Sequence, residues 1–450
     1  MKQKICLHGV DIKHQAQLLG LVKKLLPPCT VKYKVKEKYF SDNDMYKCRM
    51  ARFTPKINGT DYSVVCAWGV LLVSDKPVQV ADIVLEFDGR SGEAVTAMQR
   101  ILAKLLSGKQ RFVLDEPDLS RRIDLHRGCY CLDKLNDYDA ENAATALVCH
   151  IPWQLYGINK LWEQVLVTSG SQRPLWRQLR VKLRRLRSFL ALVKPLLPET
   201  EALEWQQKIK AKATAMAGVR EFDVMLLTCS RLRMRQSGND EENTETAAKR
   251  QENLPSGNER MQTVSNLQRL LEQLRKQELQ KSLQGLKLNL LTLELAQLLL
   301  FLQVQAAQSK EQRWDLTGFF RKRLGGWAEK IQLLPQKYSD ISDREQLHKI
   351  RIKLKRFRYA LQSVPELSAS PRLLRSLKYL QDMLGILHDD YVNERYMENL
   401  AANHQEIPEL RYEIALLRGW EQAKADAAME QLAAQWEEFS SLLAAWQEEL

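Results

Sequence analysis

With 450 residues, 45% of them hydrophobic and 27% charged, the chain is long enough for two or three domains and has an ordinary globular composition. Its net charge of +13 is unusual and indicates a polyanionic partner: nucleic acid, an anionic membrane surface or a phosphate polymer. Charge alone does not choose among the three.

The sequence has no evident targeting or membrane-spanning segment. Residues 1–7 are too polar for a signal peptide, and the most apolar stretch, residues 290–302, is interrupted by Glu294 and Gln297. A transmembrane helix needs about 18 or more mostly apolar residues. We therefore expect a buried helix at 290–302, no membrane partner and a cytoplasmic protein.

The cysteine pattern indicates neither a metal site nor a disulfide framework. Seven of the eight cysteines lie within the first 149 residues, and none forms a C-x-x-C pair. Cys129 and Cys131 lack the partner residues of a zinc site. We expect reduced, half-buried thiols, with no metal and no cofactor.

The first 135 residues predict a domain of mixed α and β structure. In chain order we expect strands at 2–7, 31–40, 45–53, 62–73 and 81–87, and helices at 15–26 and 92–107. Alternation along the second strand places two sets of side chains on opposite faces: Lys32, Lys34, Lys36 and Lys38 against Tyr33, Val35 and Tyr39.

From residue 145 to residue 450 the pattern is helical throughout. Leucines recur at spacings of three and four residues, which is typical of amphipathic helices. One segment, residues 235–260, is polar and rich in turn formers. We interpret it as a disordered insertion between helices.

An internal repeat is the strongest signal in the helical region. Residues 177–190 (RQLRVKLRRLRSFL) align with residues 348–361 (HKIRIKLKRFRYAL) at a constant offset of 171, with six of 14 positions identical. Self-similarity of this kind predicts a duplicated helical unit.

On a helix, at about 100° per residue, each copy separates a basic stripe from an apolar face. The first basic stripe is Arg177, Arg180, Arg184 and Arg187, and the second is His348, Arg351, Lys355 and Arg358. The adjoining apolar faces are Leu179, Leu183, Leu186 and Leu190, and Ile350, Leu354, Phe357 and Leu361.

No acidic residue interrupts either basic stripe. Like charges one turn apart destabilise a helix by a few tenths of a kcal/mol per pair, so a purely structural helix usually includes glutamates. Stacked cations are explained if an external anion neutralises them, because arginine binds phosphate bidentately and lysine adds a point charge. A solvated basic face is the alternative.

The two stripes resemble the paired signatures of the CHAD family, the conserved histidine α-helical domain, whose motif reads H-x-x-R-x-x-x-[RK]-[RK]-x-R. The second copy matches with His348, Arg351, Lys355, Arg356 and Arg358. The first matches with Arg180, Arg184, Arg185 and Arg187, and Arg177 stands at the histidine position.

The segments that follow each copy extend this resemblance. Residues 377–385 resemble the family, and residues 216–224 contain an element similar to its G-x-x-R-D-x-D-V signature, with Glu221 in place of an aspartate. From the residues alone, both glycine-containing segments predict tight helix crossings, the first braced by Arg220 and Asp223. A metal role for Asp389 and Asp390 lacks the necessary ligand count.

The resemblance covers about residues 145–450. It implies a pseudo-symmetric all-α bundle that binds inorganic polyphosphate through its basic residues, often at polyphosphate granules. It also nominates further contacts near the two motifs: Lys208, Lys212, Arg321, Arg323, Lys330, Arg375 and Lys378.

The N-terminal region, residues 1–135, resembles a degenerate CYTH domain at residues 84–93 and 118–128. CYTH proteins are antiparallel barrels that bind triphosphate, and their enzymes hold metal with an N-terminal E-x-E-x-K motif. Residues 2–7 read KQKICL, so that metal holder is missing. The resemblance implies an inactive barrel with a basic interior formed by Lys32, Lys34, Lys36, Lys47, Arg49 and Arg52. An unrelated α+β domain is the alternative.

We therefore expect a non-catalytic protein that binds inorganic polyphosphate in a basic groove between the two repeat helices. A CYTH-type triphosphatase whose helical domain recruits the substrate is one alternative, although its carboxylate motif is absent. A generic nucleic-acid binder is another, and no nucleic-acid-binding signature supports it. The oligomeric state stays open.

His348 lies in line with the second basic stripe. A general base would need a nucleophile and an orienting acid within reach, and the sequence indicates neither. We interpret His348 as a hydrogen-bond donor to phosphate or as a structural residue at the helix start, and His388 as structural.

Overall fold

The computed structural model describes residues 2–55, 61–127, 143–236, 264–286, 289–308, 316–334, 344–364, 367 and 370–450. By contacts the chain divides into two compact units. Unit 1 contains Met1–Thr214 and Gly285–Phe319, and unit 2 contains Ala215–Gln284 and Phe320–Leu450. The predicted domain end at residue 135 and most of the predicted insertion at 235–260 lie outside the described residues.

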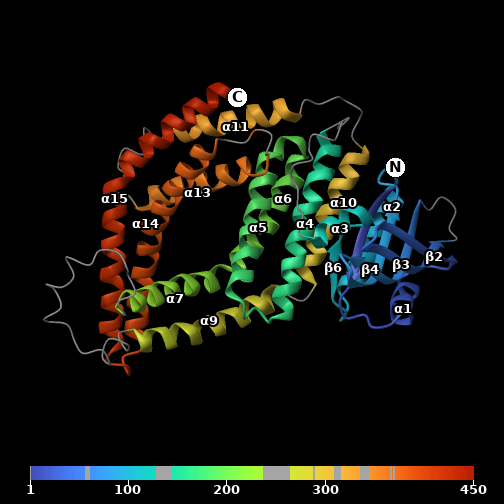
Figure 1. The fold of residues 1–450 in the computed structure, drawn as a ribbon, viewed down its shortest axis with the longest axis horizontal. Helices are drawn as coiled ribbons and strands as arrows, with labels where there is room; N and C mark the ends of the chain where they lie inside the picture. Colours follow the sequence, from blue (N-terminus) through green and yellow to red (C-terminus); the bar gives the residue numbers. More distant parts are fainter. Residues whose placement is uncertain are drawn as a thin grey trace. The chain divides into compact units, whose positions relative to one another are not determined.

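Unit 1 contains a six-stranded antiparallel sheet in the order β2-β3-β4-β5-β1-β6 (Figure 1). The bounds are β1 (Gln3–Gly9), β2 (Cys29–Ser41), β3 (Asp44–Pro55), β4 (Tyr62–Val73), β5 (Lys76–Phe87) and β6 (Phe112–Asp115). The five predicted strands are confirmed, and β6 is an addition.

The predicted closed barrel is wrong. β2 and β6 are the two edges of the sheet and do not pair with each other. β6 is only four residues long, too short to pair along the 13 residues of β2. Closing a barrel requires the two edge strands to pair along their length.

The pairing of β2 with β3 also corrects the predicted basic interior. Directly opposed residues share a face of an antiparallel sheet, and Lys32 lies opposite Arg52. Lys47, in contrast, lies opposite Glu37, and Arg49 lies opposite Val35. Lys47 and Arg49 therefore lie on the other face from the β2 lysines and Arg52, and the six cations do not line one surface.

The helices of unit 1 are α1 (Gln15–Leu25), α2 (Gly92–Leu106), α3 (Leu119–Arg127), α4 (Ala143–Val167), α5 (Arg173–Leu192), α6 (Glu199–Ala215) and α10 (Leu290–Gln308). α10 is the one described helix that is long and apolar enough to cross a membrane. It packs against α4 and α2, and Leu291, Leu295 and Leu299 are fully buried. The prediction of a buried helix at this position is confirmed.

The helices of unit 2 are α7 (Ala217–Gln236), α9 (Ser265–Leu286, of which residues up to Gln284 belong to this unit), α11 (Leu316–Gln332, of which Phe320 onward belongs to this unit), α13 (Arg344–Leu361), α14 (Pro371–Asn403) and α15 (Leu410–Glu449). α14 and α15 run side by side along much of their length (Figure 1). A core cluster joins α7, α9, α14 and α15, with Met225, Leu271, Met397 and Leu417 at 0–1% exposure.

Two polar contacts fix α9 within that cluster. The Glu413 carboxylate accepts hydrogen bonds from the backbone N–H groups of Asn266 and Leu267, in the first turn of α9. A carboxylate at a helix N-terminus satisfies unpaired donors and complements the helix dipole. The buried Arg275 donates to Asp223 of α7 at 2.6 Å.

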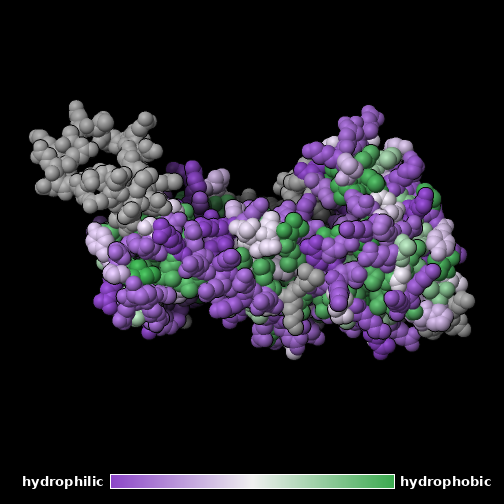
Figure 2. Space-filling model, turned by 90° about the horizontal axis from the view of Figure 1, so that it is seen from below, coloured by the Kyte–Doolittle hydropathy of each residue, from purple (hydrophilic) through white to green (hydrophobic). Residues whose placement is uncertain are grey.

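Hydrophilic side chains cover most of the face shown in Figure 2, and apolar groups appear there only in small patches. This distribution agrees with a chain in which 27% of the residues are charged. The charged groups relevant to function are therefore distinguished by their spacing and partners, not by surface charge in general.

Candidate functional site

The first basic stripe lies on α5, in unit 1. Leu179, Leu183 and Leu186 are fully buried and Leu190 is 1% exposed, which confirms the predicted apolar face. α5 packs against α4. Arg180, Arg184 and Arg187 are half-buried beside them, whereas Arg177 and Arg185 are exposed.

Positive charge accumulates around α5. Burial lowers the pKa of Lys182, and the neighbouring charges of Arg185 and Lys160 lower it further. Lys160 comes from α4, so two helices contribute cations to one locality. Sequence reasoning overlooked both lysines. Lys182 was detectable because it lies between Arg180 and Arg184, but Lys160 is brought to the site only by tertiary packing.

The second basic stripe lies on α13, in unit 2. Its apolar face is buried as predicted, with Leu354 and Phe357 at 0%, Leu361 at 2% and Ile350 at 7% exposure. Phe357 packs edge-on against Trp446 of α15, with ring centroids 5.9 Å apart. His348, Arg351, Lys355 and Arg358 are half-buried along the adjoining face.

α14 supplies partners to the second stripe. Nδ1 of His348 lies 3.0 Å from Nδ1 of His388, and the two rings are tilted by 33° with centroids 4.1 Å apart. A hydrogen bond between two ring nitrogens needs one protonated and one bare nitrogen, so both rings cannot be imidazolium while it persists.

Arg351 is held beside the histidine pair. Its Nη2 lies 3.7 Å from Oδ1 of Asp389. A Cβ added at Gly385 would lie 3.3 Å from the same Nη2, which is closer than ordinary van der Waals contact. The missing side chain at Gly385 therefore makes room for the Arg351 guanidinium between α13 and α14.

Arg356 lies off the second stripe, on the side of α13 near α11. Its guanidinium lies 5.8 Å from the ring centroid of Trp327, and Arg323 approaches the same ring at 5.8 Å. Burial lowers the pKa of both arginines. The residues matched to the second motif therefore occupy two separate faces of α13.

The other nominated cations have varied surroundings. Lys212 forms a half-buried ion pair with Glu294 of α10 at 3.0 Å, so an internal carboxylate already neutralises it. Lys208 lies over the Trp205 ring, 4.4 Å from its centroid. Arg375 donates from Nε to the Pro371 carbonyl at 3.3 Å. Three further nominated cations are exposed: Arg321, Lys330 and Lys378.

A buried carboxylate of α15, that of Glu421, lies against α14. Glu421 of α15 accepts a hydrogen bond from Asn393 at 2.9 Å. Burial raises the pKa of Glu421 to about 7, and the charges of Asp390 and Asp389 contribute to the rise. Among the described residues, no three His, Cys, Asp or Glu side chains are grouped closely enough to hold a metal ion.

Several carboxylates of the N-terminal sheet form ion pairs with arginines. Arg122 is 2% exposed and forms ion pairs with Asp82 and Asp115. Burial raises the pKa of Asp82, but the charge of Arg122 and the hydrogen bond from His8 outweigh it and hold this pKa at about 2. Glu86 pairs in the same manner with Arg52 and Lys4.

Comparisons with known proteins identify the helical region. The model of the CHAD domain family matches residues 163–398, a range that includes both basic stripes and most of α14. The crystal structure of the CHAD domain from the plant Ricinus communis is similar to the chain with a TM-score of 0.49 and 22% identity, covering 67% of this chain and 91% of that chain. A comparison with curated proteins finds no match. The N-terminal sheet lies outside the family match.

Proposed function

Because the chain belongs to the CHAD family through residues 163–398, we propose that it binds inorganic polyphosphate through its two basic stripes. In this proposal each stripe is an anion-binding surface of its own unit. Phosphate oxygens would replace the carboxylates that an ordinary helix surface provides.

The observation that carries this proposal is that each stripe lies beside a fully packed apolar face. Leu183 in α5 and Leu354 in α13 are completely buried, so the backbone under the cations is held in place. Half-burial of Arg180 and Arg351 restricts their side chains. Cations ordered before binding lose less conformational entropy when an anion binds.

Binding in this proposal uses few specific contacts and many charges. The arginines donate bidentate hydrogen bonds to phosphate oxygens, Lys355 adds a point charge, and His348 adds a hydrogen-bond donor. Binding would release condensed counterions, so affinity falls steeply as salt rises, by the same principle as for nucleic acids.

We also propose that binding occurs without catalysis, in the cytoplasm, with association at polyphosphate granules. Two contacts support the non-catalytic part. Nδ1 of His348 lies within hydrogen-bonding distance of another histidine, His388, whereas the ring of a general base is usually oriented by an acid. In the N-terminal sheet, Asp82 and Asp115 are neutralised by Arg122.

The test is a titration with long-chain polyphosphate at physiological salt. A combined variant replaces Arg180, Arg184, Arg351 and Lys355 by Glu, which reverses two charges in each stripe. Since these residues line the half-buried edge of each apolar face, circular dichroism first establishes that the variant is folded. We expect its affinity for polyphosphate to fall about 100-fold or more.

A matched control variant carries the same change in net charge away from the stripes. It replaces four exposed cations by Glu, two from each unit: Arg100, Lys104, Arg395 and Arg411. We expect this control to lose only a small part of the affinity, and excess single-stranded nucleic acid not to displace polyphosphate from wild type. Equal losses in the two variants, or no binding by wild type, would contradict the proposal.

A further inference from the structure

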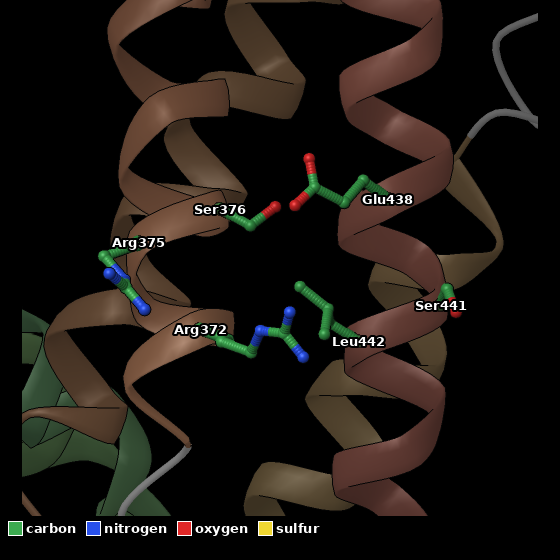
Figure 3. Close-up of a pocket in the computed structure, with 6 residues that line it drawn as sticks. All are labelled: Arg372, Arg375, Ser376, Glu438, Ser441 and Leu442. Atoms are coloured by element: carbon green, nitrogen blue, oxygen red, sulfur yellow. The ribbon is translucent and has the colours of Figure 1, made fainter.

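A pocket lies within unit 2, between the first turns of α14 and the last turns of α15 (Figure 3). It has a volume of about 380 Å³. Arg372, Arg375 and Ser376 line it from α14, and Glu438, Ser441 and Leu442 line it from α15. None of these residues belongs to either basic stripe.

One end of the pocket favours an anion. Arg372 extends from α14 toward α15 beside Leu442 (Figure 3), and it makes no hydrogen bond or ion pair with any described residue. Arg375 lies less than one turn further along, at the rim. Both belong to the first turns of a 33-residue helix, where the positive end of the helix dipole adds to their charge.

A buried hydroxyl group points to a ligand in the pocket. Ser376 is 7% exposed, and its Oγ has no hydrogen-bond partner among the described residues. Figure 3 shows this oxygen directed across the pocket toward Glu438. Buried hydroxyl groups in folded proteins are nearly always hydrogen-bonded to protein or water, so the Ser376 hydroxyl offers a hydrogen bond to an atom between α14 and α15.

The opposite wall carries a negative charge. The Glu438 carboxylate faces Ser376 and makes no hydrogen bond or ion pair with any described residue. A carboxylate only accepts hydrogen bonds, so it matches ligand hydroxyl groups and repels a second phosphate. A polyphosphate chain therefore does not fit, whereas a molecule with one phosphate and several hydroxyl groups does.

We propose that this pocket binds a small phosphomonoester with a hydroxylated body, such as a sugar phosphate, with its phosphate on Arg372 and its hydroxyl groups on Ser376 and Glu438. Arg375 adds positive charge beside the phosphate. This site goes beyond polyphosphate binding and does not depend on it, because it uses neither stripe.

Isothermal titration calorimetry of the full chain tests the proposal with three probes: glucose 6-phosphate, inorganic phosphate and glucose. Glucose 6-phosphate should bind about 10-fold more tightly than inorganic phosphate, since only it engages both walls. Glucose should show no measurable binding. Equal affinities for glucose 6-phosphate and inorganic phosphate would overturn the proposal.

Variants locate the binding. Arg372→Gln should weaken glucose 6-phosphate binding about 10-fold, because it removes the charged phosphate contact, while Arg395→Gln, an exposed arginine of the same helix, should not. Glu438→Ala should weaken the sugar phosphate and strengthen inorganic phosphate. An unchanged Arg372→Gln variant would overturn the site.

A stripe variant separates this proposal from polyphosphate binding. Replacing Arg351 and Lys355 by Glu should leave glucose 6-phosphate affinity unchanged, since neither residue lines the pocket. Loss of sugar phosphate binding in that variant would overturn the assignment to the α14–α15 pocket. Failure of polyphosphate binding alone would leave this assignment intact.

Discussion

The two basic helices, α5 and α13, have matching buried apolar faces but different surroundings. In α5 the stripe is accompanied by further cations, and the pKa of Lys182 is lowered by burial and by Arg185 and Lys160. In α13 the stripe meets α14, which supplies His388 and the Asp389 carboxylate. Repetition of a sequence therefore preserved the spacing of leucines and cations, while neighbouring helices set the charge environment of each copy.

The glycines that follow the two copies differ in the same way. A Cβ at Gly385 would press on Arg351 of the second stripe, whereas a Cβ at Gly218 would lie 2.7 Å from Glu278 of α9. The predicted tight crossing at Gly385 agrees with the packing of α13 against α14, whereas Gly218 approaches only the side chain of Glu278. The bracing acid Asp223 is bound by Arg275, which sequence reasoning did not pair with it.

The largest expected effect tests whether the apolar face of each basic helix is equally important for stability. Leu183→Ala and Leu354→Ala each remove a fully buried side chain, and each should cost about 2–5 kcal/mol of unfolding free energy. Chemical denaturation followed by circular dichroism measures both. The exposed Leu203→Ala in α6 is the control and should cost far less. A cost below about 1 kcal/mol for either substitution would contradict the view that both apolar faces are tightly packed.

Splitting the charge reversal sharpens the comparison between the stripes. Arg180→Glu with Arg184→Glu, and Arg351→Glu with Lys355→Glu, should each weaken polyphosphate binding by about 10-fold or more. The loss should be greater for α5, because Arg185 and Lys160 add positive charge beside Lys182 there, whereas Asp389 lies beside Arg351 in α13. Equilibrium binding at two salt concentrations measures both. A loss confined to α13 would break the expected order.

The buried Glu421 of α15 should make the stability of the protein depend on pH. The folded-state pKa of Glu421 is about 7 and its ordinary value is 4.5, so the folded state retains this proton as pH rises while the unfolded state releases it. Stability should therefore fall from about pH 4.5 to about pH 7 and then level off.

Glu421→Gln imitates the protonated carboxyl group, so its stability should not fall between about pH 4.5 and about pH 7. We expect the variant to be more stable than wild type by about 1–3 kcal/mol at pH 8 and nearly equal to it at pH 4.5. Thermal unfolding at the two pH values measures the difference. A stability difference independent of pH would show that Glu421 titrates normally.

The smallest expected effect concerns the acid beside the second stripe. Asp389→Asn removes the carboxylate 3.7 Å from Arg351 and should raise polyphosphate affinity about 2–3-fold at low salt, with less gain at high salt. Glu430→Gln, an exposed acid of α15, is the matched control and should have no comparable effect. Weaker binding by the Asp389 variant would assign the carboxylate a positioning role for Arg351.

Most secondary-structure elements were predictable because they are long and periodic. The 12-residue β4 was predicted residue for residue, and the buried faces of α5 and α13 follow from leucine spacing. The four-residue β6 was missed because it is too short to show a period, and the nine-residue α3 has mixed polarity. The barrel prediction failed because closure depends on whether the edge strands β2 and β6 pair, which alternation along a single strand cannot reveal.

The amino-acid sequence by itself determined the helical class, the two stripes and the family, since all three depend on spacings of three, four and seven residues that any helix preserves. Only the tertiary structure decided which cations keep an open face. Lys212 is neutralised by Glu294, Arg356 turns to Trp327, and Arg351 lies between Gly385 and Asp389. These outcomes depend on contacts between residues far apart in the chain, where Coulomb attraction and close packing act on distances that sequence separation does not encode.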